Sequence, residues 1–178
     1  MGLIILVVIF LVVGLAYSYF KANLEGIETD TTINLESGSM RIVYEGGSKI
    51  EVMDFAPSNE PLAVKNFTIT GNSTINNAVL GYKISLIIDE NTFSEDAISY
   101  TLESANIAGN GEVIPSILEH QAINNEDILL GTGYFTGIIS NSVHSYKLKF
   151  YFLDIEENNI QDIDKYFEVH ILVENNRI

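Results

Sequence analysis

Short stretches in which apolar and polar residues alternate dominate the chain after residue 20, and they constrain its fold more than any other feature. In residues 143–153, every second position from Tyr146 to Phe152 is apolar, with Lys147 and Lys149 between them. The same period of two recurs in residues 79–89, 97–103 and 165–174. Because successive side chains of a strand point to opposite faces, each segment is expected to form a strand with one buried face.

Further strands are expected where β-rich runs are separated by turn residues. Residues 31–36 and 39–44 flank Ser37-Gly38, which is a hairpin-like break. About seven to nine such runs are expected from the spacing of turn residues. The sequence therefore predicts an all-β fold in which two antiparallel sheets pack face to face as a β-sandwich.

Two segments fit this pattern less simply. Residues 62–70 alternate irregularly, with Val64 on the apolar side and Lys65 expected on the other. Residues 115–125 carry a helical signal, because their apolar residues are spaced for one face of a helix. We expect one short helix there, with these side chains pointing inward: Ile117, Leu118 and Ala122.

A second strong feature is a run of 18 uncharged, mostly apolar residues at positions 3–20. As a helix rising about 1.5 Å per residue, this run reaches roughly 27 Å, close to the ~30 Å thickness of a bilayer's hydrocarbon core. We therefore expect one N-terminal hydrophobic helix in a membrane. The chain then divides into a signal or anchor segment at 1–20, a linker or donor-like strand at 21–30 and a β-sandwich domain at 31–178.

The hydrophobic segment has two interpretations. Ala16 and Ser18 supply the small residues that a signal peptidase requires, with cleavage before Tyr19. A signal peptide also has a basic region at its start, and residues 1–2 contain no basic side chain, which favours a retained anchor. Under both interpretations the domain is expected outside the cytoplasm, at the cell membrane or in the extracellular space.

The composition excludes several kinds of partner and site. Nine basic and 24 acidic residues give a net charge of −15. Nucleic acid is therefore not an expected partner, because affinity for phosphates comes mostly from clustered Lys and Arg. Since the chain has no cysteine, it can form no disulfide, thiol nucleophile or thiolate metal site.

Catalytic motifs are absent from the sequence. The three histidines, at positions 120, 144 and 170, form no H-E-x-x-H pair, and no G-x-S-x-G elbow occurs. His144 and His170 fall inside strand patterns, where we expect hydrogen-bonded structural roles. Gly131-Thr132-Gly133 lacks the further glycine and the lysine of a phosphate-binding loop. We expect no enzymatic activity and no cofactor, although a Ser-His-Asp site assembled from distant residues stays open.

The acidic stretch at residues 154–164 is the best candidate for an ion site. Calcium takes about six to eight hard oxygen ligands. The stretch supplies candidate oxygen ligands at Asp154, Glu156, Asn158, Asp162 and Asp164. Its spacing departs from the EF-hand loop, which has a glycine at its sixth position and a glutamate at its twelfth. The alternative is a solvated loop whose charges keep a sheet edge soluble.

The order of several segments along the chain is also informative. A hydrophobic leader ends in AYSYF at residues 16–20, and LESGSMRI follows at residues 35–42. Pro57 precedes further strand-like segments at residues 64–69, 82–86, 145–150 and 165–167. Together they resemble the TasA/camelysin family of secreted biofilm-matrix and surface proteins of Gram-positive bacteria. The chain departs from that pattern in lacking a basic leader start and in having Gly-Ser-Met where the family usually has Gly-Thr-Leu.

The resemblance implies a jelly-roll-like sandwich, export and, as in TasA, fibres in which an N-terminal strand passes to the next subunit. Such a strand would pair with an open sheet edge of its neighbour. Residues 19–30 are the candidate donor in this chain. The protease activity associated with camelysin is not carried over, because the sequence contains no zinc motif.

These observations predict an exported or membrane-anchored structural protein of the cell surface or extracellular matrix. It would act by protein–protein contact, including self-association and fibre assembly, and would contact the membrane through residues 3–20. One alternative is a pilin-like filament subunit, although cleavage at Gly2 would place Val7 where pilins usually carry a glutamate. The other is an exported hydrolase with an unrecognised site.

Overall fold

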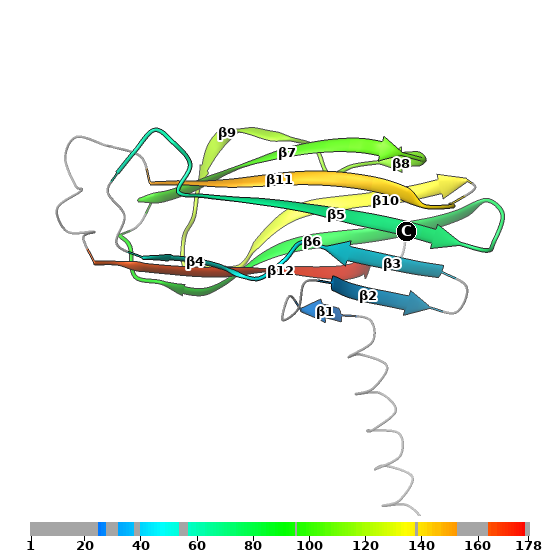
Figure 1. Ribbon diagram of the computed structural model, residues 1–178, viewed down its shortest axis with the longest axis horizontal. Helices are drawn as coiled ribbons and strands as arrows, with labels where there is room; N and C mark the ends of the chain where they lie inside the picture. Colours follow the sequence, from blue (N-terminus) through cyan, green and yellow to red (C-terminus); the bar gives the residue numbers. More distant parts are fainter. Residues whose placement is uncertain are drawn as a thin grey trace, which may run out of the picture.

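The computed structural model describes residues 25–27, 32–37, 40–53, 57–94, 96–137, 139–152 and 164–176. These ranges contain no helix. They form the twelve strands of Figure 1: β1 (Glu25–Ile27), β2 (Thr32–Ser37), β3 (Met40–Glu45), β4 (Ile50–Met53), β5 (Ala63–Ser73), β6 (Ala78–Asn91), β7 (Ile98–Ala108), β8 (Asn110–Glu112), β9 (Ile117–Ala122), β10 (Ile128–Gly137), β11 (Ser142–Phe152) and β12 (Tyr166–Asn176).

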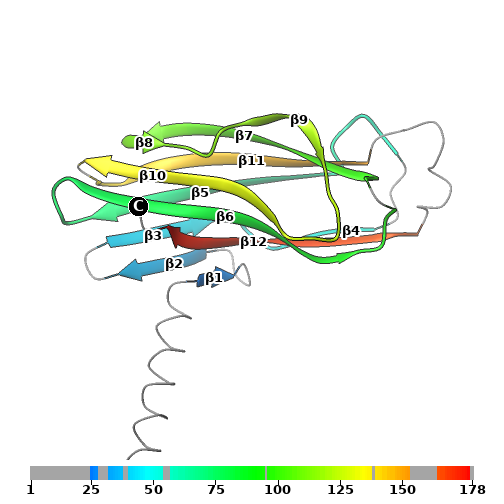
Figure 2. The same cartoon turned by 180° about the vertical axis from the view of Figure 1, so that it is seen from behind.

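The strands form two antiparallel sheets that pack face to face, as Figures 1 and 2 show from opposite sides. Sheet A has the order β1-β12-β6-β10-β8, and β4 also pairs with β12. Sheet B has the order β2-β3-β5-β11-β7-β9. The all-β antiparallel sandwich is therefore confirmed. The twelve strands exceed the expected seven to nine, partly because β1, β4 and β8 are only three or four residues long and too short to alternate visibly.

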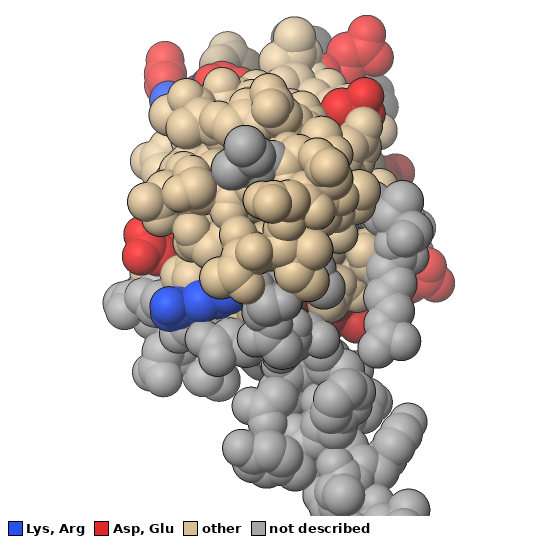
Figure 3. Space-filling view, turned by 90° about the vertical axis from the view of Figure 1, so that its right-hand side faces the viewer, with Lys and Arg blue, Asp and Glu red and all other residues tan. Residues whose placement is uncertain are grey.

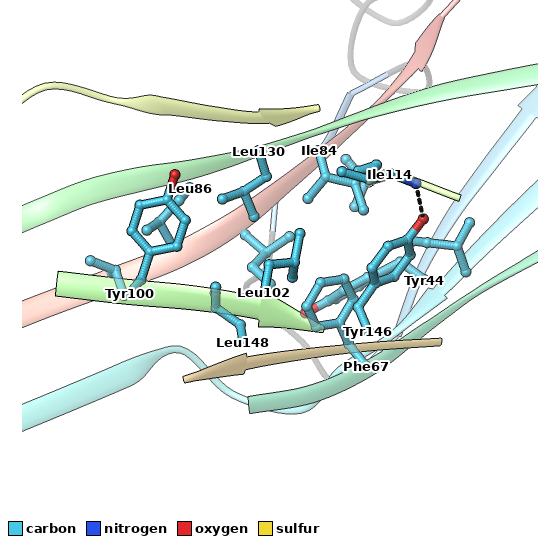
Figure 4. Packing of buried hydrophobic residues seen from close by; sticks show 14 of the residues in the cluster. Tyr44, Phe67, Ile84, Leu86, Tyr100, Leu102, Ile114, Leu130, Tyr146 and Leu148 are labelled. Atoms are coloured by element: carbon cyan, nitrogen blue, oxygen red, sulfur yellow. Dashed lines mark hydrogen bonds between the residues drawn. The ribbon is translucent and has the colours of Figure 1, made fainter. Parts of the chain in front are cut away.

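The inward faces of the long strands alternate as the sequence predicts. On β11 and β12 the inward apolar side chains are almost completely buried, and Phe150 and Phe167 meet across the core with ring centroids 5.6 Å apart. Phe152 packs edge-on against Phe93 at 5.2 Å. Figure 4 shows other parts of this cluster. Burial of apolar surface, at about 25 cal/mol per Å², is the main stabilising contribution to such a core.

The inward face of β5 differs from the expectation. Val64 is 46% exposed, whereas Lys65 is 5% exposed and shares its face with the buried Phe67 and Ile69. The lysine Nζ donates a hydrogen bond to the backbone carbonyl of Ser48 at 2.5 Å. Because a lysine stem can line apolar surface while its charged end finds a polar partner, this position tolerates a charge that the sequence pattern assigned to solvent.

Residues 115–125, which the spacing predicts as a helix, instead contain the edge strand β9. This strand pairs with β7, and the Ile123 N–H donates to the Ile98 carbonyl at 2.8 Å. Leu118, expected to point inward, is 73% exposed. The helical prediction is wrong because the edge of sheet B offers backbone hydrogen bonds, and such tertiary pairing overrides local spacing.

The predicted N-terminal helix at 1–20 lies outside the described residues and stays a prediction. Of the linker at 21–30, the structure describes β1, which pairs with residues 172–174 of β12 at the edge of sheet A. In the part of the chain that the structure describes, no helix has the length and apolar character needed to cross a membrane.

Substitutions on β11 test the register of the core. Phe150 is fully buried, so Phe150→Ala should lower the free energy of unfolding by roughly 3–5 kcal/mol. The neighbouring Lys149 points outward and pairs with Glu103 at the surface, so Lys149→Ala should change it by only about 0.5 kcal/mol. Denaturant unfolding of both variants is the measurement. Equal losses would contradict this register of β11.

Candidate functional site

The three histidines lie in separate settings. His170 Nδ1 is 2.6 Å from Asp89 Oδ2 on the outer face of sheet A. His120 Nδ1 is 3.2 Å from Ser99 Oγ, and the described residues bring no hydrogen-bonded carboxylate to that pair. His144 is buried and hydrogen-bonded between the sheets. His144 and His170 are thus hydrogen-bonded, as expected, and no Ser-His-Asp arrangement forms around any of the three histidines in the described residues.

Most of the sites predicted from sequence lie outside the described residues. These are the candidate leader cleavage residues Ala16, Ser18 and Tyr19, and four of the five calcium candidates, Asp154, Glu156, Asn158 and Asp162. The fifth, Asp164, is exposed in the turn before β12 with a φ of 59°. Within the described ranges no three His, Asp or Glu side chains gather in a way that could hold a metal ion. Both sites stay predictions.

A chain of buried polar groups joins the two sheets. Tyr82 projects from β6 of sheet A, and its Oη lies 2.5 Å from His144 Nδ1 and 2.5 Å from Tyr146 Oη on β11 of sheet B. The backbone N–H of Ile114 donates to Tyr146 Oη at 3.1 Å, the bond dashed in Figure 4. The three side chains are at most 1% exposed. We call Tyr82, His144 and Tyr146 the buried polar chain.

Counting donors and acceptors decides in which direction the hydrogen bonds of the buried polar chain run. If Tyr146 donates to Tyr82, and Tyr82 donates to His144 Nδ1, both hydroxyls have an acceptor and the imidazole carries its proton on Nε2. In the reverse direction the Tyr146 proton would lack an acceptor among these groups. The first arrangement leaves one unpaired group, Nε2, which is buried with no partner in the described residues. Since each unpaired buried group costs free energy, the first arrangement is favoured.

Burial keeps all three members uncharged at neutral pH. It lowers the pKa of His144 to about 4, because a buried imidazolium loses its hydration. Burial also raises the pKa of Tyr82 and of Tyr146 above the usual value for tyrosine. A general acid or base must reach the proton that it transfers, and these groups do not reach the surface. The chemistry therefore suits a structural link between the sheets.

One end of the sandwich is free of charge on its loops. Three connections have described residues there: 74–77 between β5 and β6, 109 between β7 and β8, and 139–141 before β11. None contains Lys, Arg, Asp or Glu. Figure 3 looks onto this end, where uncharged surface fills the centre and charged side chains lie around the rim. We call it the neutral end.

The neutral end also presents aliphatic side chains to solvent. Ile75 is 50% exposed and Ile107 is 64% exposed, and Val79 on the adjoining part of β6 is 48% exposed. The neighbouring exposed side chains are small and polar, chiefly Asn, Ser and Thr. A surface of this composition attracts a partner through apolar burial, and no charge has to be desolvated on contact.

Hydrogen bonds hold the loops of the neutral end together. The Ser73 N–H donates to the Ile139 carbonyl at 2.8 Å, and the Asn141 N–H donates to Asn72 Oδ1 at 2.8 Å. Both bonds tie the end of β5 to the connection that precedes β11. Gly109 has a φ of 89°, and a Cβ there would collide with the first residue of β11. These contacts fix the relative position of the loops.

The opposite end is strongly acidic. In the described residues of the connections there, five carboxylates and one lysine occur: Glu60, Asp96, Glu126, Asp127, Asp164 and Lys165. These described connections therefore have a net negative charge, whereas those of the neutral end have none.

Neither the buried polar chain nor the neutral end follows from a motif. The signals are indirect: the members of the buried polar chain occupy inward positions of alternating segments, and residues 66–82 and 128–146 contain no Lys, Arg, Asp or Glu.

No family model matches the sequence, and no curated protein matches it. Among solved structures, the CBM22-1 xylan-binding domain of Paenibacillus barcinonensis Xyn10C is 9% identical over 88% of this chain and 95% of that chain, with a TM-score of 0.27. The CBM22-2 domain of the same protein is 9% identical over 86% and 99%, with a TM-score of 0.23. TmCBM61 in complex with beta-1,4-galactotriose is 6% identical over 85% and 87%, with a TM-score of 0.22. TM-scores this low indicate no ligand for this chain.

The depressed pKa of His144 makes stability depend on pH. The unfolded chain binds a proton at this imidazole below about pH 6.5, whereas the folded chain binds it only below about pH 4. The free energy of unfolding therefore falls as the pH is lowered from about 6.5 to about 4. Between pH 7 and pH 5 the loss should be about 2 kcal/mol. In His144→Asn, which keeps a side-chain acceptor but cannot titrate, that part of the loss should disappear.

Denaturant unfolding at both pH values measures this effect. His120→Asn, which replaces an exposed histidine, is the matched control and should keep the wild-type loss. If the wild type and His144→Asn lose the same free energy between pH 7 and pH 5, the imidazole is not held neutral by burial.

The central hydroxyl of the buried polar chain should matter more than a comparable hydroxyl at the surface. Tyr82→Phe removes the partner of both His144 and Tyr146, and should lower the free energy of unfolding by roughly 2–4 kcal/mol. Tyr134→Phe removes a hydroxyl that bonds Glu112 on an outer strand, and should cost under about 1 kcal/mol. Thermal unfolding of the two variants compares them; similar losses would contradict the buried role of Tyr82.

Proposed function

We propose that this chain is a structural protein of the cell surface or extracellular matrix that works by contact with other proteins, including copies of itself. The observation that carries the proposal is the neutral end: an ordered, uncharged surface with exposed aliphatic side chains on a chain of net charge −15. Exposed apolar patches on a folded domain are typical of interaction sites.

The cellular placement rests on the sequence. The 18 uncharged residues at positions 3–20 support export or anchoring, with the sandwich outside the cytoplasm. The proposal includes the relationship to TasA/camelysin-like proteins and the jelly-roll-like arrangement that this relationship implies. Fibre assembly belongs to the same proposal, with residues 19–30 as the donor segment. In the monomer the described part of that segment, β1, pairs with its own β12.

Cell fractionation with mass spectrometry of the mature N-terminus tests the placement. Recovery from the membrane or the medium is expected, beginning at Met1 for an anchored chain or at Tyr19 for a cleaved one. Recovery of the intact chain from the cytoplasm would contradict the proposal.

Self-association should strengthen with added salt. Copies with a charge of −15 repel each other, and salt confines that repulsion to about 8–10 Å at ~0.1–0.15 M. Light scattering of the chain from Tyr19 should therefore report larger species as salt is raised at pH 7, and smaller ones when residues 19–30 are deleted. Lowering the pH toward the isoelectric point of about 4.3 would also reduce repulsion, but protonation of His144 would destabilise the fold at the same time.

A chelator must be present throughout, because calcium bound at residues 154–164 would mimic the effect of salt. Light scattering that reports a monomer for both chains at every salt concentration would remove self-association from the proposal.

A further inference from the structure

The uneven distribution of charge limits how two copies can approach each other. The described residues of the connections at the acidic end carry five carboxylates and one lysine, whereas those of the neutral end carry no charge. Contact between two acidic ends would bring like charges together, which is unfavourable. Contact between an acidic end and a neutral end would desolvate carboxylates with no cation opposite them. Contact between two neutral ends has neither cost.

The length of the sandwich also favours that arrangement. The long strands have 10 to 14 residues, and at ~3.4 Å per residue an 11-residue strand is about 37 Å long. Two copies joined at their neutral ends would hold their acidic ends roughly 70 Å apart. That separation is several times the screening length of about 8–10 Å in physiological salt. At that ionic strength the charge that keeps copies apart in other orientations therefore contributes little here, and repulsion weakens this contact only when the salt is lower.

The neutral end also has fixed loops and exposed aliphatic side chains, and both favour contact. Hydrogen bonds from the end of β5 hold the connection that precedes β11, so docking loses little conformational entropy there. Ile75 lies on the β5–β6 connection and Ile107 near the end of β7; both are exposed aliphatic groups, and their burial would supply the attraction. A surface that binds its own copy must be self-complementary. An uncharged surface opposes no like charges, however the second copy is rotated about the contact.

We propose that the neutral end is a homotypic contact surface, through which two copies of this chain associate end to end about a two-fold axis. This inference rests on the proposed function, because it names the surface used for self-association. It places Ile75 of one copy near the neutral end of its partner, and leaves the acidic ends and the outer sheet faces free.

Engineered cysteines test the contact directly, since the chain has no cysteine of its own. The full chain with Ile75→Cys or Ile107→Cys is expressed in cells and treated with a short thiol-specific crosslinker. Both variants should form covalent dimers in high yield. Leu118→Cys is the matched control, because Leu118 is equally aliphatic and 73% exposed but lies on the edge strand β9. It should remain monomeric on a denaturing gel.

A charge placed at the neutral end tests the electrostatic argument. In a two-fold contact Ile75→Asp brings two carboxylates into one interface, and should raise the dissociation constant of self-association at least ~10-fold in sedimentation of the full chain in non-ionic detergent. Ile75→Asn removes the same aliphatic side chain without adding charge, so it should raise the dissociation constant by less than Ile75→Asp does. Leu118→Asp should leave it unchanged.

Two results would overturn the inference while the proposed function stands. One is self-association in which Leu118→Cys crosslinks as well as the two neutral-end variants, since the copies would then meet elsewhere. The other is a surface-located chain whose neutral-end cysteines crosslink to other polypeptides in place of a second copy. Recovery of the chain from the cytoplasm is a separate result, and it would overturn the proposed function itself.

Discussion

The two central strands, β6 and β11, face each other across the core, and all the other long strands are placed by pairing with one of them. β12 and β10 flank β6, while β5 and β7 flank β11. Most of the inward side chains on the two central strands are apolar, but the buried polar chain adds directional bonds between the sheets. A slip of β11 by one residue would turn Lys147 and Lys149 into the core, at a cost that no packing gain could offset.

The strands that build this core could be predicted from the sequence, because half-buried strands leave a period of two that is visible without any tertiary information. β10 could not be predicted, since Gly131 and Gly133 interrupt its apolar positions and a register shift follows Leu129. The buried side of β5 was misassigned because alternation cannot tell a buried lysine from an exposed one when a carbonyl such as that of Ser48 is available. The candidate sites could not be predicted, because they depend on which loops lie together. The strand order sets those neighbours, and the alternation pattern does not reveal the strand order.

The two features that the sequence did not reveal are connected through β11. This strand begins at the neutral end with Ser142, and its next two inward positions are His144 and Tyr146. The hydrogen bonds that order the neutral end attach to the residues just before it, Ile139 and Asn141. The position of the neutral-end loops therefore depends on β11, whose buried His144 must stay uncharged. Protonation of His144 at low pH would thus disturb both the core and the neutral end.

The strand order also decides when the molecule can fold. Each central strand pairs with partners far along the chain: Ala63 lies opposite Phe150, and Tyr82 lies opposite Asn175. Loop-closure entropy must be met before such distant pairings form, which slows folding. Sheet A lacks one of the two strands that flank β6 until β12 has been synthesised. The complete sandwich therefore cannot form before β12 has left the ribosome, and under the proposed export this delay would keep the polypeptide in the unfolded state that a secretion channel requires.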